Sequence, residues 1–281
     1  MKKVLVIGSK GMAGHVIYKS LPLLGDYDVY GLARNVVQTD RLFNIDVSDT
    51  IALKSIIDDF QFDIVINCIG ILNKDAEDNP DKAIWFNSYF PHLLESLTKD
   101  IKCKVISIST DCVFSGKKGG YTEDDFKDGE GFYAQSKALG EIVNEKDLTI
   151  RTSIIGPELN KNGIGLFHWF MQQQKEISGY TQAFWSGITT IELAKVIDQV
   201  IKQNMRGLIV VAGKNKIDKY SLLVLFNKVF KNNSIVINQN PKYKVDKSMY
   251  SSRNDFKYSV PSYEEMIVDM KKWIDTNFSN Y

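Results

Sequence analysis

The sequence is poor in the residues that cross-link small secreted proteins and bind metals. Its 281 residues contain three cysteines and three histidines. Cys68, Cys103 and Cys112 are too few and too irregularly spaced for a disulfide framework or a zinc site, and the histidines show no metal-ligand spacing. We therefore expect no metal site, and cysteines that stay reduced in a cytoplasmic protein.

Long apolar runs and an excess of charge are also absent. No run approaches the ~20 apolar residues that span a bilayer, and the apolar start of MKKVLVIG ends too early for a signal peptide. The formal net charge of +1 gives no electrostatic footprint for nucleic acid or an anionic membrane, and we expect neither partner. An apolar fraction of 44% is that of an ordinary globular protein.

The first half of the chain alternates strand-like and helix-like segments. Apolar, β-branched runs lie at 4–7, 28–31, 63–68, 104–109 and 148–151, and helical periodicity lies between them at 12–24, 50–60, 81–97 and 133–144. Strands without polar alternation, separated by helices, indicate a parallel sheet that is covered on both faces. The pattern predicts an α/β fold with a doubly wound parallel sheet (Rossmann), which binds ligands at the carboxyl ends of its strands.

The second half is less regular. We expect helices at 165–174, 190–203 and 221–230, a strand at 208–211, and a last helix whose capping box is Ser262 with Glu265. We therefore divide the chain into residues 1–155, the nucleotide-binding Rossmann domain, and residues 156–281, a smaller region that rests on the first and can interleave with it.

Three glycines between the first strand and the first helix predict a dinucleotide site. Gly8, Gly11 and Gly14 allow a tight turn, close approach of the backbone to a pyrophosphate, and close packing of helix and strand. The helix start would direct free N–H groups at the phosphates.

The second strand indicates which cofactor binds. A site for NAD carries an acidic residue there, but this strand ends in Arg34, which can pair with a 2′-phosphate. We expect NADPH, with NADH as the alternative and with a solvated surface arginine as the alternative for Arg34. Asp46 can contact the adenine edge or begin the next helix. The expected cofactor-binding residues are Gly8, Lys10, Gly11, Met12, Gly14, Arg34, Asp46, Val47, Cys68, Ile69, Gly70, Tyr133 and Lys137.

The predicted catalytic residues are Thr110, Tyr133 and Lys137. Thr110 ends a central strand, and Tyr133 opens a helix on which Lys137 follows one turn later. Reduction of a ketone leaves an alkoxide that a tyrosine can protonate. The Lys137 ammonium and the oxidised nicotinamide would favour phenolate and lower the tyrosine pKa, and a threonine can hold the carbonyl oxygen. Tyr243 and Lys247 have the same spacing without this context, and we interpret them as a chance pair.

The chain resembles the extended short-chain dehydrogenase/reductases, and within them the dTDP-4-dehydrorhamnose reductases. The glycine spacing, Asn67, Thr110 and Tyr133-xxx-Lys137 carry the first resemblance, and "STDCVFSG", "YTED", "YAQSKALGE" and "RTS" carry the second. Ala76-Glu77 and Asn87 fit the segment between the fourth and fifth strands. The resemblance covers most of residues 1–155. It implies NADPH-dependent reduction of the 4-keto group of a nucleotide-activated 6-deoxyhexose for surface polysaccharide synthesis, with Tyr133 as the acid, Lys137 as its tuner and ribose anchor, and Thr110 as the carbonyl partner.

Two departures from that family leave the sugar open. Cys112 stands where the family usually has tyrosine, and Ile154 stands where an aromatic residue is common. A UDP-2-acetamido-2,6-dideoxy-4-hexulose is therefore an alternative substrate. The expected substrate contacts are Asp111, Cys112, Ile154, Tyr180 and Trp185. The nucleotide sugar is the expected partner, and a homodimer is one option for the oligomeric state.

Two other functions compete with reduction. The first is epimerisation or dehydration of a nucleotide sugar, but dehydratases of this superfamily tend to have an acid-glutamate pair after the hydroxyl, whereas Asp111-Cys112 follows Thr110 here. The second is a non-catalytic regulatory role, as in the methionine adenosyltransferase beta subunit, against which the complete Thr/Tyr/Lys set argues.

Overall fold

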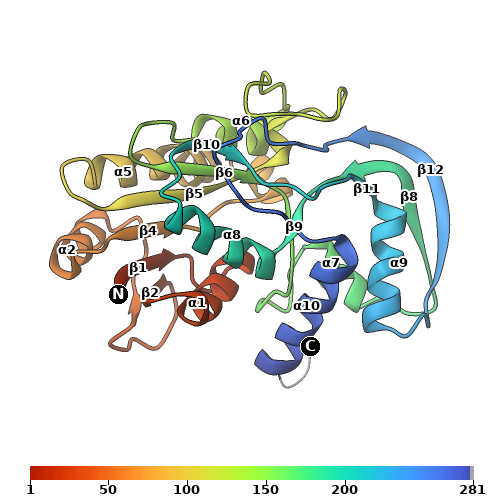
Figure 1. Cartoon of the computed structure of the whole chain (residues 1–281), viewed down its shortest axis with the longest axis horizontal. Coiled ribbons are helices and arrows are strands. Elements are labelled where there is room, and N and C mark those ends of the chain that lie inside the picture. Colours follow the sequence, from red (N-terminus) through yellow and green to blue (C-terminus); the bar gives the residue numbers. More distant parts are fainter. Residues whose placement is uncertain (279–281) are drawn as a thin grey trace.

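A seven-stranded parallel sheet organises the computed structural model, which describes residues 1–278 (Figure 1). The strand order is β10-β6-β5-β4-β1-β2-β3. The bounds are β1 Lys2–Ile7, β2 Tyr27–Ala33, β3 Leu42–Asn44, β4 Ile64–Asn67, β5 Lys104–Thr110, β6 Leu148–Thr152 and β10 Gly207–Val210. The predicted α/β fold with a doubly wound parallel sheet is confirmed.

Helices cover both faces of this sheet because its strands are apolar on both sides. Along β1, Val4 and Val6 pack toward α1 (Met12–Leu24) and α8 (Thr190–Lys202), whereas Leu5 and Ile7 pack toward α2 (Thr50–Phe60) and α5 (Phe90–Leu97). This alternation is the two-residue period of a strand that is buried on both faces.

The predicted helix at 81–97 is a composite of three segments. It consists of α4 (Pro80–Ala83), a π-helical segment (Ile84–Tyr89) and α5, and the short α3 (Asn73–Asp78) precedes it. The predicted helix at 133–144 is α6 (Gly131–Leu139), which ends before Gly140. A Cβ on Gly140 would overlap the carbonyl oxygen of Asn87, so this glycine permits close contact between α6 and the π-helical segment.

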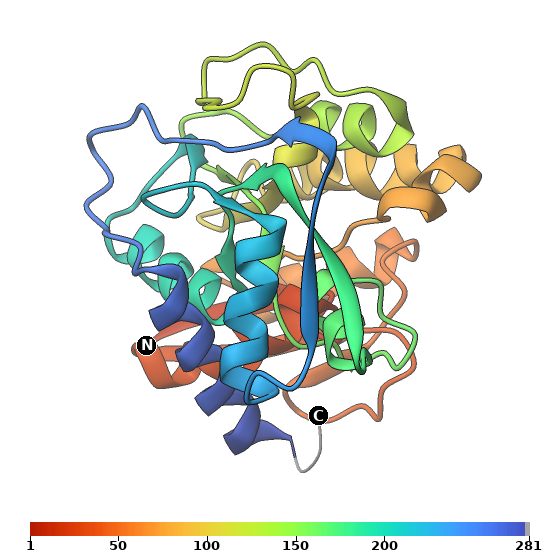
Figure 2. The ribbon, with the colours of Figure 1, turned by 90° about the vertical axis from the view of Figure 1, so that its right-hand side faces the viewer.

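The second half contains a sheet that the sequence did not reveal. β8 (Glu176–Trp185) pairs in parallel with β12 (Val236–Asp246) and antiparallel with β11 (Ile217–Asp218). Figure 2 shows α9 (Lys219–Phe230) beside these strands. α7 (Leu166–Met171) and α10 (Tyr263–Asn277) complete the layer, and β7 (Ile154–Ile155) pairs with β9 (Ile188–Thr189) between the two sheets.

Residues after 155 contribute to both sheets. β10 pairs with β6 at the edge of the seven-stranded sheet, and α8 packs against α1. Twelve of the 24 buried residues in the core beneath α1 and α8 lie after residue 155. Within residues 1–278, no helix is long and apolar enough to cross a membrane, and no group of three or more His, Cys, Asp or Glu side chains could hold a metal ion.

Candidate active site

The carboxyl ends of β1, β2, β4 and β5 meet at one edge of the sheet, where the glycine turn lies. Gly8 has φ of +80°, and its N–H and that of Ser9 donate to the carbonyl oxygen of Leu32. A Cβ on Gly14 would overlap the Gly8 carbonyl oxygen, so glycine lets α1 start directly against the turn. α1 has no side-chain cap at Gly11, which leaves its first N–H groups, beginning at Met12, free for an anion.

Two cations lie at the end of β2 beside this turn. The Lys10 ammonium donates to the carbonyl oxygen of Asn35 at 3.2 Å, and Arg34 pairs with Asp46, also at 3.2 Å. Hydrogen bonding from Ser48, aided by Arg34, holds the pKa of Asp46 below its usual range. Val47, the next predicted residue, is buried in the core beneath α2. Arg34 remains largely exposed and available to a further anionic group.

The segment after β4 forms the opposite wall of the cofactor edge. The Ile69 N–H donates to the Asn67 side chain at 3.1 Å, and a Cβ on Gly8 would contact the Cys68 carbonyl carbon at 3.3 Å. Gly70 lies against Asn87, whose side-chain amide bonds to both the N–H and the carbonyl oxygen of Ile71. This double hydrogen bond fixes the backbone opposite the glycine turn.

The side chains of Thr110 and Tyr133 lie close together where β5 ends. Thr110 is 8% exposed, and its hydroxyl accepts from the Cys112 N–H at 3.1 Å. Burial raises the pKa of Tyr133, the nearby Cys112 and Asp111 raise it further, and the hydrogen bond with Thr110 opposes them. Lys137 is not among the groups that shift this pKa, and burial keeps the phenol protonated in the protein alone; the lowering by Lys137 together with the oxidised nicotinamide stays a prediction.

Lys137 is buried one turn after Tyr133 on α6. Its ammonium donates to the carbonyl oxygen of Ile108 at 2.7 Å, two residues before Thr110. Burial lowers the pKa of Lys137 to about 8, and the charge of Glu141 is the main opposing effect. Glu141 is itself buried and pairs with the fully buried Arg151 at 2.8 and 2.9 Å. This ion pair holds a negative charge near the Lys137 ammonium.

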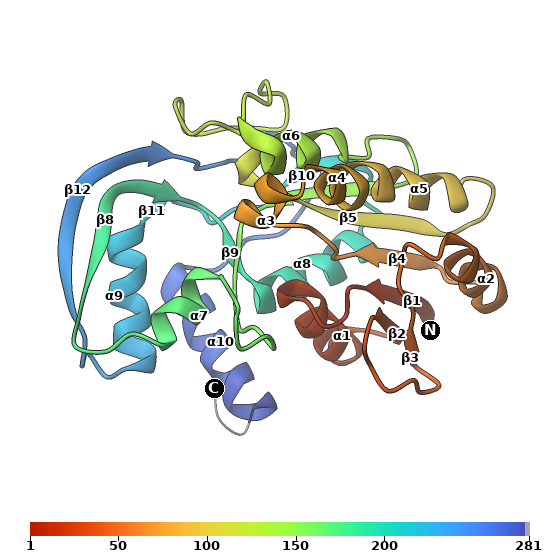
Figure 3. The ribbon, with the colours of Figure 1, turned by 180° about the vertical axis from the view of Figure 1, so that it is seen from behind.

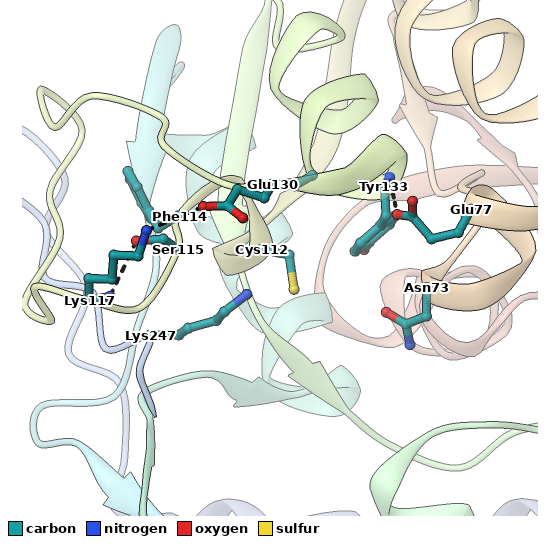
Figure 4. A pocket seen from close by; sticks show the side chains of 10 residues that line it. Asn73, Glu77, Cys112, Phe114, Ser115, Lys117, Glu130, Tyr133 and Lys247 are labelled. Atoms are coloured by element: carbon teal, nitrogen blue, oxygen red, sulfur yellow. Dashed lines mark hydrogen bonds and ion pairs between the residues drawn. The ribbon is translucent and has the colours of Figure 1, made fainter. Parts of the chain in front are cut away.

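A cavity of about 350 Å³ opens in front of Tyr133 (Figure 4). Lys247, which follows β12, points toward Cys112 across this cavity. Burial raises the pKa of the Cys112 thiol, Asp111 raises it further, and Lys247 opposes them. The lining residues are Asn73, Glu77, Cys112, Phe114, Ser115, Lys117, Glu130, Tyr133, Ala134 and Lys247.

The other predicted substrate residues have different surroundings. Asp111 is buried and accepts from the Thr110 hydroxyl at 3.2 Å, whereas Ile154 packs against the core beneath α1. Trp185 is 3% exposed, with the Lys219 ammonium 4.8 Å from its ring centroid. Tyr180 is 42% exposed and contacts Tyr243 instead of lining the cavity.

Lys247 lines the cavity, although the sequence predicts no role for it. Tyr243, which lies four residues before it, does not line the cavity. The two side chains therefore do not act as a pair, although Lys247 itself lines the cavity. Lys219 lies near Asp111 and Cys112. Burial lowers the pKa of Lys219, and the charges of these two neighbours oppose that effect. No sequence pattern marks these lysines, because the path of the second half of the chain brings them to the end of β5.

Comparison with known proteins identifies relatives along most of the chain. The model of a family described as the RmlD substrate binding domain matches residues 1–245. The spore coat polysaccharide biosynthesis protein SpsK of Bacillus subtilis is 30% identical over 70% of this chain and 69% of its own length. The methionine adenosyltransferase 2 subunit beta of mouse is 28% identical over 57% of this chain and 49% of its own. The matches span between about half and about two thirds of the length of such curated relatives.

Solved structures share the fold over the whole chain. The structure of a dTDP-4-dehydrorhamnose reductase from Bacillus anthracis, in complex with NADP, superposes with a TM-score of 0.82 and covers 99% of this chain and 100% of that one. At 20% sequence identity, this likeness concerns the fold alone.

Proposed function

This chain belongs to the family described as the RmlD substrate binding domain, and from that premise we propose that it is an NADPH-dependent reductase. The proposed reaction reduces the 4-keto group of a nucleotide-activated 6-deoxyhexose, as in dTDP-4-dehydrorhamnose reductase. The observation that carries this proposal is the proximity of Thr110 to Tyr133, which lines a cavity at the same edge of the sheet as the glycine turn.

The residues at the cofactor edge fit NADPH. The turn at Gly8, Gly11 and Gly14 can receive the pyrophosphate on the uncapped start of α1. Arg34 and Lys10 add positive charge at the end of β2, where a 2′-phosphate would lie. The fixed backbone at 68–70 forms the nicotinamide side of the site. NADPH would supply the hydride for the carbonyl carbon.

Tyr133 supplies the proton in this proposal. The developing alkoxide takes the phenolic proton, and burial keeps that proton on Tyr133 until the alkoxide forms. Thr110 can direct a carbonyl oxygen toward the Tyr133 phenol because the Thr110 side chain lies close to that phenol. Lys137, held by the Ile108 carbonyl oxygen, can bind ribose hydroxyls and stabilise the phenolate that remains.

Two lysines from the second half support a substrate with a diphosphate. Lys247 lines the cavity and forms no ion pair with a carboxylate in the described residues 1–278, and Lys219 lies near Asp111 and the cavity residue Cys112. A lysine that lines the cavity and a second one near Cys112 place positive charge on this side of the site, which favours an anionic ligand. A nucleotide sugar carries that anion beside the sugar to be reduced.

A regulatory role is the second candidate, because the similarity to the methionine adenosyltransferase 2 subunit beta favours it. The catalytic set and its open cavity favour turnover over a regulatory role.

The proposal also includes a cytoplasmic location, supported by three free cysteines and the need for NADPH. The formation of a homodimer stays a prediction, which size-exclusion chromatography can test.

The test is a panel of dTDP- and UDP-linked 4-keto-6-deoxy sugars, including the 2-acetamido form, offered with NADPH to the purified protein. We expect oxidation of NADPH with at least one of them, together with formation of the 4-hydroxy sugar. Absence of turnover across the panel, with NADPH binding intact, would favour the regulatory role.

A further inference from the structure

The first turn of α6 is capped by a side chain from a distant part of the sequence. The two carboxylate oxygens of Glu77 accept hydrogen bonds from the N–H groups of Phe132 and Tyr133, each at 3.1 Å. These are amides at the helix start that lack a partner within the helix. Glu130 precedes the helix without capping it. Glu77 therefore supplies the cap that the local sequence lacks.

The backbone of Gly131 brings this carboxylate close to the helix. Gly131 has φ of +87°, and a Cβ there would lie 2.7 Å from a Glu77 carboxylate oxygen. Glycine is thus required both by the left-handed conformation and by the approach of Glu77. The Glu77 cap and Gly131, the first residue of α6, therefore depend on each other.

The element that carries Glu77 is fixed to the cofactor edge. Glu77 belongs to α3, which follows the segment 68–72 directly and lies beside α6 (Figure 3). Asn87 bonds to the Ile71 backbone on one side and to the Ser136 hydroxyl of α6 on the other. α3 is further anchored by Ala76, which is fully buried. α6 is therefore held at its start by Glu77 of α3 and near its middle by Asn87 of the π-helical segment, which also bonds to the backbone that precedes α3.

We propose that Glu77 is a positioning residue for Tyr133. Its carboxylate fixes the first turn of α6, and with it the direction of the phenol, relative to the backbone at 68–70. The chemical consequence rests on the proposed function, because it is there that Tyr133 delivers a proton beside the nicotinamide. A misplacement of about 1 Å in such a site can lower the rate about 100-fold. A carboxylate is also the favourable group at the positive end of a helix.

The kinetic test is a double-mutant cycle between Glu77 and Tyr133, using the best substrate from the panel. We expect Glu77→Ala to lower kcat about 10- to 100-fold while the Kd for NADPH changes less than about threefold. Glu77→Gln keeps one acceptor oxygen and should recover part of the loss. In the Tyr133→Phe background, Glu77→Ala should have no further effect. An equal loss of kcat in both backgrounds would overturn the proposal.

The matched control is Asp78→Ala, because Asp78 is the next carboxylate of α3 and pairs with Lys74 away from α6. This variant should keep wild-type kcat. A loss as large as that of Glu77→Ala would mean that damage to α3, and not the cap, explains the effect.

A second measurement needs no substrate. Amide hydrogen exchange followed by NMR should show faster exchange at Phe132 and Tyr133 in Glu77→Ala than in Asp78→Ala. Unchanged exchange at these amides would overturn the cap itself. If the wild-type protein turned over no sugar, the proposed function would fail while the exchange data still decided whether Glu77 holds the first turn.

Discussion

At the scale of single residues, burial affects the pKa of Tyr133 more than the lysine that follows it does. Tyr133 lies against Thr110 and stays protonated because its surroundings disfavour phenolate. The motif Tyr-xxx-Lys correctly located both side chains on one helix. It could not reveal that Lys137 bonds to the Ile108 carbonyl oxygen, because that contact depends on how α6 packs on β5.

Tyr133→Phe removes the proposed proton and leaves the ring in place. We expect kcat to fall about 10²- to 10⁴-fold and the Kd for NADPH to change little, as measured by steady-state kinetics and by titration of NADPH fluorescence. Tyr243→Phe alters the tyrosine of the other Tyr-xxx-Lys pair and serves as the control with normal turnover. Normal turnover in Tyr133→Phe would remove the acid role.

Lys137→Met should change how stability depends on pH. Burial lowers the pKa of Lys137 to about 8, whereas an unfolded lysine has a pKa of about 10.4. Between these values the unfolded chain binds more protons, so the wild-type protein gains stability as pH rises through this window. Below pH 8 Lys137 is charged in the folded protein, so the full cost of burying that charge lowers the free energy of unfolding.

Methionine carries no charge, so the free energy of unfolding of Lys137→Met relative to wild type should be highest below pH 8. That difference should shrink by on the order of 2–3 kcal/mol by about pH 10, as measured by urea denaturation. Lys104, whose pKa is also lowered to about 8, is present in both proteins and cancels in the comparison. Parallel curves would show that Lys137 is not desolvated.

Arg34→Ala tests the preference for NADPH. Removing an exposed cation that can pair with the 2′-phosphate should raise the KM for NADPH about 5- to 10-fold, corresponding to about 1 kcal/mol of a charge-assisted contact. The KM for NADH, which lacks that phosphate, is the internal control. Equal changes in the two KM values would return Arg34 to the role of a surface residue paired with Asp46.

At the scale of elements, apolar periodicity predicted the first half well and the second half poorly. The strands β1, β4, β5 and β6 are buried on both faces, so their composition stands out. β12 is polar, contains Pro241 and is interrupted by a register shift between Asn240 and Lys244. Its pairing with β8 is decided by tertiary contacts, so the position of Lys247 could not be predicted.

Gly14→Ala should disrupt the junction of β1 and α1. The added Cβ would overlap the Gly8 carbonyl oxygen, so either the turn or the helix must move. We expect a loss of about 1–3 kcal/mol in the free energy of unfolding and a large rise in the Kd for NADPH, both measurable by titration. Leu23→Ala at the exposed end of α1 is the control, since Leu23 is 85% exposed. An unaltered Kd for NADPH in Gly14→Ala would show that the glycine turn does not bind the cofactor.

At the scale of the whole molecule, the first sheet is incomplete without the second half. The core beneath α1 draws half of its buried residues from beyond residue 155, including those of α8. We expect a fragment of residues 1–155 to remain unfolded, as measured by far-UV circular dichroism and by dispersion of amide NMR signals. The full chain is the control, and a well-dispersed spectrum for the fragment would show that the sheet is stable without β10 and α8.

The pairing of β10 with β6 also bears on how the protein is made and how it diversifies. During synthesis on the ribosome, β6 emerges more than fifty residues before its neighbour at 207–210, so the nascent sheet carries an open edge for which chaperones can compete. In evolution, recombination at a single crossover near residue 155 would transfer that strand and α8 along with the cavity residue Lys247. If the proposed function holds, we therefore expect new specificity to arise more readily from point changes around Cys112 and Lys247 than from exchange of modules.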